Sequence, residues 1–301
     1  MKKVILCISA MLFVGAVGTA QILPGTIAPN TSYVNQTGYS QDAYVHQIGT
    51  AQSSSVKQMV SDNDSDVYQG VYPGQMTILG VNISHDNSAE VVQSGDQNSA
   101  FISQNNWRNK AYQTQTGDKN EATIWQDETN VSYGLFVGNL KGEDKATQTQ
   151  TGKSNKATID QGTSGNTLPT ASVFTGMAPL TASVPKSPHG RNEATQTQTG
   201  SFGEAYASQG GLDNESNQTQ TSGAFASGAS KNVSNHYQFG NDNLANSTQT
   251  GYRNTENVLQ EGNGNMSYGT QTAASILSTG NASIVIQQGN ANLSNVIQSN
   301  N

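Results

Sequence analysis

The chain lacks most of what normally holds a folded protein together. Of its 301 residues only 33% are hydrophobic and 12% are charged, and its one cysteine is Cys7, near the N-terminus. A single cysteine excludes an intrachain disulfide and a Cys-based structural metal site. A conventional apolar core is therefore not expected, and the composition by itself is typical of a disordered or prion-like polypeptide.

Positive charge is also scarce. The chain has 14 Lys and Arg against 21 Asp and Glu, a net charge of −7, and loss of Lys2 and Lys3 by cleavage would make it −9. Such an acidic chain is a poor candidate for binding nucleic acid, because phosphate contacts require clustered Lys and Arg.

The N-terminus has the pattern of a signal peptide. Met1, Lys2 and Lys3 give a short positive region, residues 4–17 form an apolar stretch, and residues 18–20 are small residues that precede Gln21. The apolar stretch is too short to cross a bilayer comfortably. Residues 1–20 are therefore predicted to be a secretory signal peptide, and no membrane insertion of the mature chain is expected.

Amide side chains are what the sequence has in abundance, with 29 Gln and 32 Asn. They recur in 19 seven-residue segments of the form [Asn/Gln]-x-[Ala/Ser]-x-z-x-Gln, whose final glutamines are 11 residues apart within each group. Asn or Gln fills the first position in 17 segments, and Ala or Ser fills the third in 18. The final glutamines are Gln36, Gln47, Gln58, Gln69, Gln93, Gln104, Gln115, Gln126, Gln150, Gln161, Gln198, Gln209, Gln220, Gln238, Gln249, Gln260, Gln271, Gln287 and Gln298.

The spacing within a segment predicts a β-strand. Positions 1, 3, 5 and 7 share one face of an extended strand but would be scattered around a helix. In "NKATIDQ", Asn155, Ala157, Ile159 and Gln161 are predicted to point inward. Position 5 is Val or Ile in 11 segments, as an inward position would be.

The residues between segments predict turns. Gly follows the final Gln by two residues in 11 of the 19 segments, and all seven prolines fall outside the segments. Gly suits tight turns, and proline is excluded from fully paired strands. The sequence therefore predicts an all-β fold, a β-solenoid of stacked two-strand coils with about 22 residues per coil, 11 per strand-turn unit, stacked about 4.8 Å apart as cross-β.

Stacking would also satisfy the buried amides, because like lies on like and each amide can both donate and accept along a ladder. The final glutamines are accordingly predicted to form an inward ladder for self-assembly. Asparagines at position 1 join this ladder: Asn98, Asn109, Asn120, Asn155, Asn192, Asn214, Asn232 and Asn254.

The chain is predicted to be organised in four parts. Residues 1–20 are the signal peptide, and residues 21–161 form an N-terminal repeat stack. Residues 162–191 hold four of the seven prolines and no strand pattern, which predicts a Pro/Gly/Ser/Thr-rich insertion. Residues 192–301 form a C-terminal repeat stack.

The repeat resembles that of the curlin family, Ser-x5-Gln-x-Gly-x-x-Asn-x-Ala-x3-Gln. "QTGDKNEATIWQ" (115–126) and "QTGKSNKATIDQ" (150–161) match the second part of this motif at every specified position. The resemblance implies a secreted subunit of bacterial curli-type functional amyloid, polymerising on the extracellular surface for biofilm matrix, adhesion and colonisation. It also implies passage through the periplasm and a dedicated outer-membrane export pore, with a nucleating or co-polymerising curlin-like subunit as partner besides the chain itself. Family members commonly have few, even repeats, whereas this chain has many repeats and long insertions.

No catalytic, cofactor or metal site is predicted, and the chain is not expected to be an enzyme. The four histidines are scattered without ligand spacing. Asp62, Asp64 and Asp66 begin like a calcium loop, but Val67 stands where that loop needs glycine. These aspartates are expected to point outward as solvated charges.

Two features predict control of assembly. Glu256 occupies the inward third position of "NTENVLQ", where a carboxylate must be desolvated or protonated, so it is predicted to slow assembly. The last 40 residues carry no charge, and the strands there are apolar on both faces. They are predicted to be sticky: Ile284, Val285, Ile286, Leu293, Val296 and Ile297.

Two alternatives remain open. A monomeric secreted β-solenoid could bind ice or carbohydrate through outward threonine rows, as "TQTQTG" at 147–152 and 195–200 suggests. The row through Thr147 and Thr195 is not sustained, since equivalent positions hold Tyr112, Asn217, Asn235 and Tyr268. The other alternative is a disordered, phase-separating polypeptide.

Overall fold

The computed structural model describes residues 28–70, 84–105, 107–126, 142–162, 190–223 and 226–300. The predicted signal peptide and most of the predicted insertion at 162–191 lie outside the described residues. Within them the chain forms β-strands and one short 3-10 turn, Gly228–Ser230.

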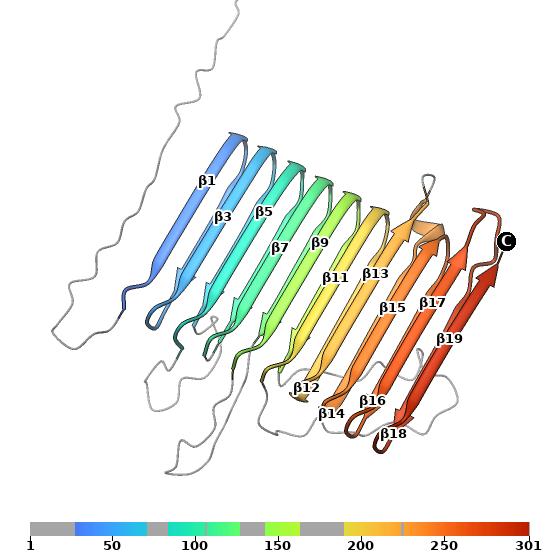
Figure 1. Ribbon diagram of the computed structural model, residues 1–301. Helices are drawn as coiled ribbons and strands as arrows, with labels where there is room; N and C mark the ends of the chain where they lie inside the picture. The colour runs from blue at the N-terminus through green and yellow to red at the C-terminus, as the bar shows by residue number, and fades with distance from the viewer. Residues whose placement is uncertain are drawn as a thin grey trace, which may run out of the picture.

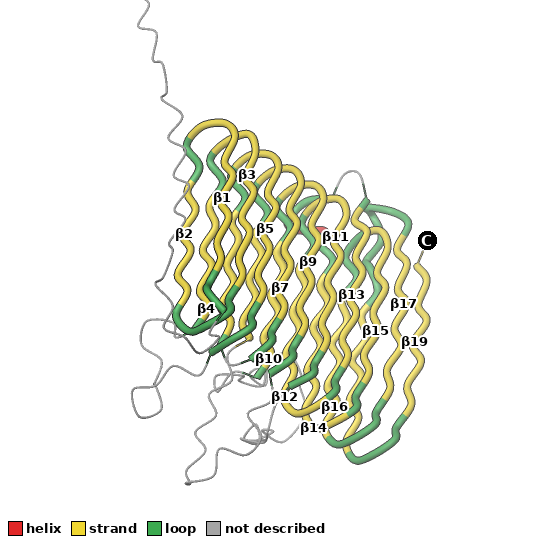
Figure 2. The backbone as a smooth tube through the Cα atoms, turned by 60° about the vertical axis from the view of Figure 1, so that its left-hand side comes forward, coloured by secondary structure: helices red, strands yellow, loops and turns green. Residues whose placement is uncertain are grey.

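The strands belong to two parallel sheets, and the chain alternates between the sheets at every turn. The ten-stranded sheet contains β1 (Thr31–Tyr39), β3 (Ser53–Ser61), β5 (Ser88–Asp96), β7 (Lys110–Asp118), β9 (Lys145–Lys153), β11 (Glu193–Ser201), β13 (Glu215–Ser222), β15 (Leu244–Gly251), β17 (Met266–Ala273) and β19 (Leu293–Asn300). The nine-stranded sheet contains β2 (Asp42–Gln47), β4 (Asp64–Gln69), β6 (Ser99–Gln104), β8 (Glu121–Gln126), β10 (Lys156–Gln161), β12 (Glu204–Leu212), β14 (Val233–Asn241), β16 (Thr255–Glu261) and β18 (Ala282–Gln288). One odd and one even strand make a coil, and the coils stack in sequence order (Figures 1 and 2).

The two sheets bury alternate residues between them. In β8, Ala122, Ile124 and Gln126 are buried, whereas the alternate residues Glu121 and Thr123 are exposed and half-buried. The next strand of the same sheet repeats these residues in register, with alanine on alanine, isoleucine on isoleucine and glutamine on glutamine. The predicted all-β solenoid of two-strand coils is confirmed.

The strand bounds differ from those of the seven-residue segments. Strands of the ten-stranded sheet run two or three residues past the final Gln, as in β7, where Gly117 lies inside the strand with φ 103°. A Cβ on Gly117 would lie 2.1 Å from the carbonyl oxygen of Gly152 in the next coil. Close stacking of neighbouring coils, as well as the positive φ, therefore requires glycine there. The left-handed turn residue comes two positions later, at Lys119.

The stack continues past the longest interval of undescribed residues. β9 pairs with β11 over nine residues, and β10 pairs with β12 over six. The strands before and after residues 163–189 therefore belong to the same two sheets. The division of the chain into two repeat stacks stays a prediction.

No helix in the described part of the chain is long and apolar enough to cross a membrane.

Candidate functional site

Two continuous glutamine ladders run through the interior, one along each sheet. All 19 final glutamines lie on them, and every Nε2 except those of the terminal Gln287 and Gln298 donates to the Oε1 of the next glutamine toward the C-terminus. In the ten-stranded sheet Gln115 donates to Gln150 at 2.9 Å, and Gln150 donates to Gln198 at 2.9 Å. In the nine-stranded sheet Gln126 donates to Gln161 at 2.9 Å. The direction of donation is the same at every step from Gln36 to Gln298 and from Gln47 to Gln287.

The second N–H of these amides joins the two sheets. Gln150 Nε2 also donates to the backbone oxygen of Glu121, and Gln126 Nε2 donates to that of Lys110, each on the facing strand. Each such amide therefore uses both donors and its acceptor without water. Because their hydrogen bonds are satisfied, these polar side chains can fill a core at 0–1% exposure.

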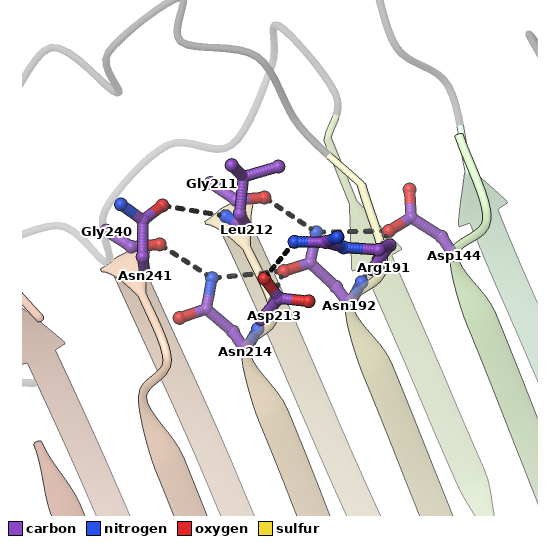
Figure 3. A network of polar contacts seen from close by, with 9 residues as sticks. All are labelled: Asp144, Arg191, Asn192, Gly211, Leu212, Asp213, Asn214, Gly240 and Asn241. Atoms are coloured by element: carbon purple, nitrogen blue, oxygen red, sulfur yellow. Dashed lines mark hydrogen bonds and ion pairs between the residues drawn. The ribbon is translucent and has the colours of Figure 1, made fainter. Parts of the chain in front are cut away.

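Asparagine ladders line the arcs that precede the strands of each sheet. Their members stand at position 1, which lies in the arc and is buried. Asn214 Nδ2 donates to Asn192 Oδ1 at 3.0 Å and to the Gly240 carbonyl at 2.8 Å, as Figure 3 shows. All eight predicted asparagines are buried, with 0–1% exposure.

Asp144 replaces asparagine at one step of these ladders. Its Oδ1 accepts the Nδ2 of Asn192 at 3.1 Å and the Asn192 backbone N–H at 2.8 Å (Figure 3). The acceptor role survives the substitution because a carboxylate oxygen takes the place of the amide oxygen.

The two kinds of ladder have opposite polarity. Glutamines donate toward the C-terminal end of the stack, whereas asparagines such as Asn120 donate toward the N-terminal end, to Asn98 Oδ1 at 3.0 Å. Rows of side-chain dipoles that run in opposite directions cancel in part, and this limits the field that either row would build alone.

The sequence interpretation missed a further glutamine ladder. At position 5 of four consecutive strands of the ten-stranded sheet, Gln113 donates to Gln148, Gln148 to Gln196 and Gln196 to Gln218, at 2.8–3.0 Å. The repeated dipeptide pattern "QTQT" was the available signal, because it places two glutamines on one face of a strand. Asn63 extends the asparagine ladder before the nine-stranded sheet, and Asn243 and Asn265 extend the one before the ten-stranded sheet.

Both ends of the stack are open. Among the described residues no strand pairs with the outer edge of β1 or β2 at one end, or of β18 or β19 at the other. Inward residues of β1 are uncovered, with Val34 at 38% exposure. No described residue donates to the Oε1 of Gln36 or Gln47, whereas Gln298 Nε2 is bonded only to the Ala282 carbonyl. One end therefore presents amide acceptors and the other presents amide donors.

Glu256 is buried inside the stack with 0% exposure, in the row between Ser234 and Ser283. Its Oε2 accepts the Ser247 hydroxyl at 2.5 Å, while no described residue bonds its Oε1. Burial raises the pKa of Glu256, and the Ser247 hydrogen bond lowers it by less. Gly269 on the facing sheet makes the room, because a Cβ there would lie 1.8 Å from Oε1.

His236 is a second buried titratable group, which the sequence interpretation did not single out. It fills position 5 of β14, where the next strand has Val258, and its Nδ1 lies 2.8 Å from the Ser216 hydroxyl. Burial lowers its pKa from 6.5 to about 3, so the ring is neutral at physiological pH.

The predicted sticky residues lie in the last two strands, β18 and β19. Ile284 is 51% exposed, and Leu293 and Ile297 are 72% and 75% exposed. Val285 is buried, whereas Ile286 and Val296 are partly buried against neighbouring apolar clusters. Buried and exposed residues alternate along β18, and the role of these two strands in assembly stays a prediction.

The described residues hold no group of three or more His, Cys, Asp or Glu side chains that could bind a metal ion. Asp62 and Asp64 are exposed and Asp66 is half-buried on the outside of the stack. Burial and the neighbouring Asp42 raise the pKa of Asp64.

The geometry defines a β-solenoid repeat protein with a polar, hydrogen-bonded core. Comparison with known families adds one match: residues 85–106 match the model of the curlin associated repeat. This match covers β5 to β6, one coil of the stack, and it supports the resemblance to the curlin family found in the repeat. No curated protein matches the chain.

Proposed function

We propose that this protein is a secreted structural subunit that polymerises end to end into an extracellular curli-type amyloid fibre. The observation that carries the proposal is the pair of open, complementary stack ends. The acceptors of Gln36 and Gln47 match the donors of Gln287 and Gln298, so a second copy can continue both ladders without a change of direction.

The open edges favour the same conclusion. Natural sheets usually protect their edges with charge, proline or a covering segment. Here β18 and β19 carry no charged residue and no proline. A contact that joins different patches of identical copies gives an open filament when it does not close into a ring.

The cellular role follows from the resemblance. We infer that fibres of this chain serve biofilm matrix, adhesion and surface colonisation. The partners are copies of the chain itself, a nucleating or co-polymerising curlin-like subunit, and a dedicated outer-membrane pore reached through the periplasm. The signal peptide at 1–20 directs the first step of that export.

The number of strands in the described part of the chain is odd, and this constrains how copies join. The stack begins with β1 and ends with β19, both in the ten-stranded sheet, so the last coil is half complete. Consecutive 11-residue units lie on opposite sheets, and a half turn about the stack axis exchanges the two sheets. The β1 strand of the next copy fills the missing half coil beside β18 when that copy is rotated by about 180°.

Fibre imaging tests both parts of the proposal. Helical reconstruction of fibres grown from the mature chain is expected to show cross-β layers, a rise of about 46 Å per subunit and a half-turn between neighbours. Deletion of residues 292–301, which removes β19, leaves whole coils, and its fibres are expected to lose the half-turn. A wild-type rotation near zero would overturn the joining scheme alone. Absence of a reflection near about 4.7 Å would overturn the fibre itself.

A further inference from the structure

Two uninterrupted rows of threonine cross the outer face of the ten-stranded sheet. They come from the tripeptide Thr-Gln-Thr on six consecutive strands, β7 to β17, whose glutamine belongs to the internal ladder. One row is Thr114, Thr149, Thr197, Thr219, Thr248 and Thr270, and the other is Thr116, Thr151, Thr199, Thr221, Thr250 and Thr272. These twelve residues are called the threonine array.

The sequence interpretation considered only the row through Thr147 and Thr195 and missed the threonine array. The row first considered, through Thr147 and Thr195, is indeed broken, because its neighbours in register are Tyr112, Asn217 and Tyr268. The array lies two and four residues further along the same strands. Only the pairing of strands 22 to 48 residues apart reveals it, since long intervals separate several of its members in the sequence.

The array is a regular two-dimensional lattice. Its members lie about 4.8 Å apart along the stack and about 6.8 Å apart along each strand, the repeats of a parallel sheet and of alternate residues. Figure 1 shows these strands side by side with nearly parallel axes. The glutamine ladder directly beneath fixes the backbone, and threonine is itself stiff at χ1.

The array is chemically uniform and unoccupied by the protein itself. Nine of its side chains are exposed and three are half-buried. In the part of the chain that the structure describes, none of the twelve hydroxyls makes a hydrogen bond to another residue. No charged residue interrupts either row. Each member therefore offers one methyl group and one free hydroxyl at a fixed lattice point.

We propose that the threonine array binds the surface of ice. A matching ligand must be periodic in two dimensions, uncharged, and able to exchange hydrogen bonds with hydroxyls at every lattice point, and crystalline water has these properties. The methyl rows restrict the first water layer and the hydroxyls anchor it, so ordered water on the array can merge with the crystal. This inference is independent of the fibre proposal, because a single subunit carries the whole array.

Other occupants fit less well. The array covers about 400 Å², half of the roughly 800 Å² per partner that a stable protein interface buries. Small molecules are usually bound in concave, largely apolar pockets, whereas this face is a flat sheet surface. A crystalline polysaccharide is periodic too, but the two rows contain no aromatic ring on which a sugar could stack.

The test uses freshly purified, monomeric mature chain. The experimental variant is Thr197→Tyr with Thr219→Tyr, which breaks one row at its centre. The matched control is Thr195→Tyr with Asn217→Tyr, on the same two strands but in the adjacent row. Tyr112 and Tyr268 already occupy that adjacent row, so the control substitutions suit the sheet. Circular dichroism must show equal β-structure for both variants.

The readouts are partition into slowly grown ice and inhibition of ice recrystallisation. The wild type and the control are expected to be enriched in the ice fraction and to keep crystals small. The Thr197/Thr219 variant is expected to lose the enrichment and the inhibition. Exclusion of the wild type from ice would overturn the proposal, as would equal enrichment of the two variants. Array-dependent binding to microcrystalline chitin or cellulose without ice partition would overturn it in favour of a carbohydrate ligand.

Discussion

The two sheets share one interior pattern but differ on their outer faces. Both bury a small residue and a ladder glutamine at the same positions. Outside, the ten-stranded sheet presents threonines, whereas the nine-stranded sheet carries aromatic rings, including Tyr68, Phe101 and Trp125 with ring centroids 4.5–5.7 Å apart. The interior therefore repeats every 11 residues and the exterior every 22. Residues that must satisfy buried amides are constrained on both strands of a coil, while each outer face is free to specialise.

The sheets also differ at position 5 of the interior. The nine-stranded sheet holds mainly Val and Ile, as at Ile102, Ile124 and Ile159, whereas the ten-stranded sheet changes from Val to four glutamines and then to Ser247 and Gly269. The last two small residues face Glu256. A large polar group on one sheet is therefore compensated by lost volume on the other.

The largest effect is expected from breaking a glutamine ladder. Gln150→Ala leaves a Gln115 donor and the Gln198 acceptor unpaired and opens a cavity, so it should lower the free energy of unfolding by about 3 kcal/mol or more. Urea denaturation of the monomer measures this. Thr149→Ala, the outward neighbour, should change stability by less than about 0.5 kcal/mol.

Gln161→Ala is the corresponding change in the nine-stranded sheet. Its cost should equal that of Gln150→Ala within the error of the measurement, since its ladder contacts are the same in kind. A large cost in one sheet only would show that the two interiors are not equivalent.

The next effect concerns the compensation between sheets. Gly269→Val places its Cβ against the Glu256 carboxylate and should destabilise the chain by about 1–3 kcal/mol. Adding Glu256→Ala, the small residue usual at that position, should recover most of the loss. Thermal unfolding of the four members of this double-mutant cycle gives the coupling. Additive effects would contradict the contact.

The next prediction concerns the contribution of the last two strands, β18 and β19, to the rate of fibre formation. Deletion of residues 281–301 should slow fibre formation strongly in thioflavin assays, and a peptide of these residues should accelerate the full-length chain, because Leu293 and Ile297 are exposed and uncharged. As a point control, Ile297→Lys should lengthen the lag and Ile297→Thr should lengthen it less. If the segment only caps the stack, the truncated chain will assemble equally fast or faster and the peptide will be inert.

His236 predicts a loss of stability in acid. Its pKa is lowered to about 3 in the folded chain and is 6.5 otherwise, so the unfolded chain binds a proton first. Stability is complete above pH 6.5 and falls toward pH 3 by about 1.4 kcal/mol per pH unit. Unfolding of His236→Val from pH 7 to 4 should lack this slope. His46→Gln should retain it.

The smallest effect is expected for Glu256 in assembly. Burial raises its pKa, so its desolvation penalty is absent below the unfolded pKa, grows between the unfolded and folded pKa values, and is complete above the folded one. Glu256→Ala should therefore shorten the lag at neutral pH. Glu215→Gln removes an exposed carboxylate and should leave the lag unchanged. An unchanged or longer lag for Glu256→Ala would contradict the proposed brake.

The sequence alone determined the local structure and the interior. The 11-residue spacing and the parity within "NKATIDQ" were enough to place Gln161 inward, because a strand has a strict two-residue period. Like side chains then stack on one another, whatever the length of the chain segment that separates two repeats. The same reasoning predicted the buried asparagines and the uncharged last coil, since each depends only on residues within one repeat.

Only the tertiary structure decided what depends on which strands meet. Gln150 bonds Gln198 across 48 residues, and the threonine array, the second glutamine ladder and the space that Gly269 leaves for Glu256 all arise between strands separated by turns or long insertions. Period and parity fix the face of a residue but not its neighbour in the next coil or on the facing sheet. Those neighbours follow from the pairing of coils, and the half-complete last coil follows from the position of β1 and β19 in the same sheet.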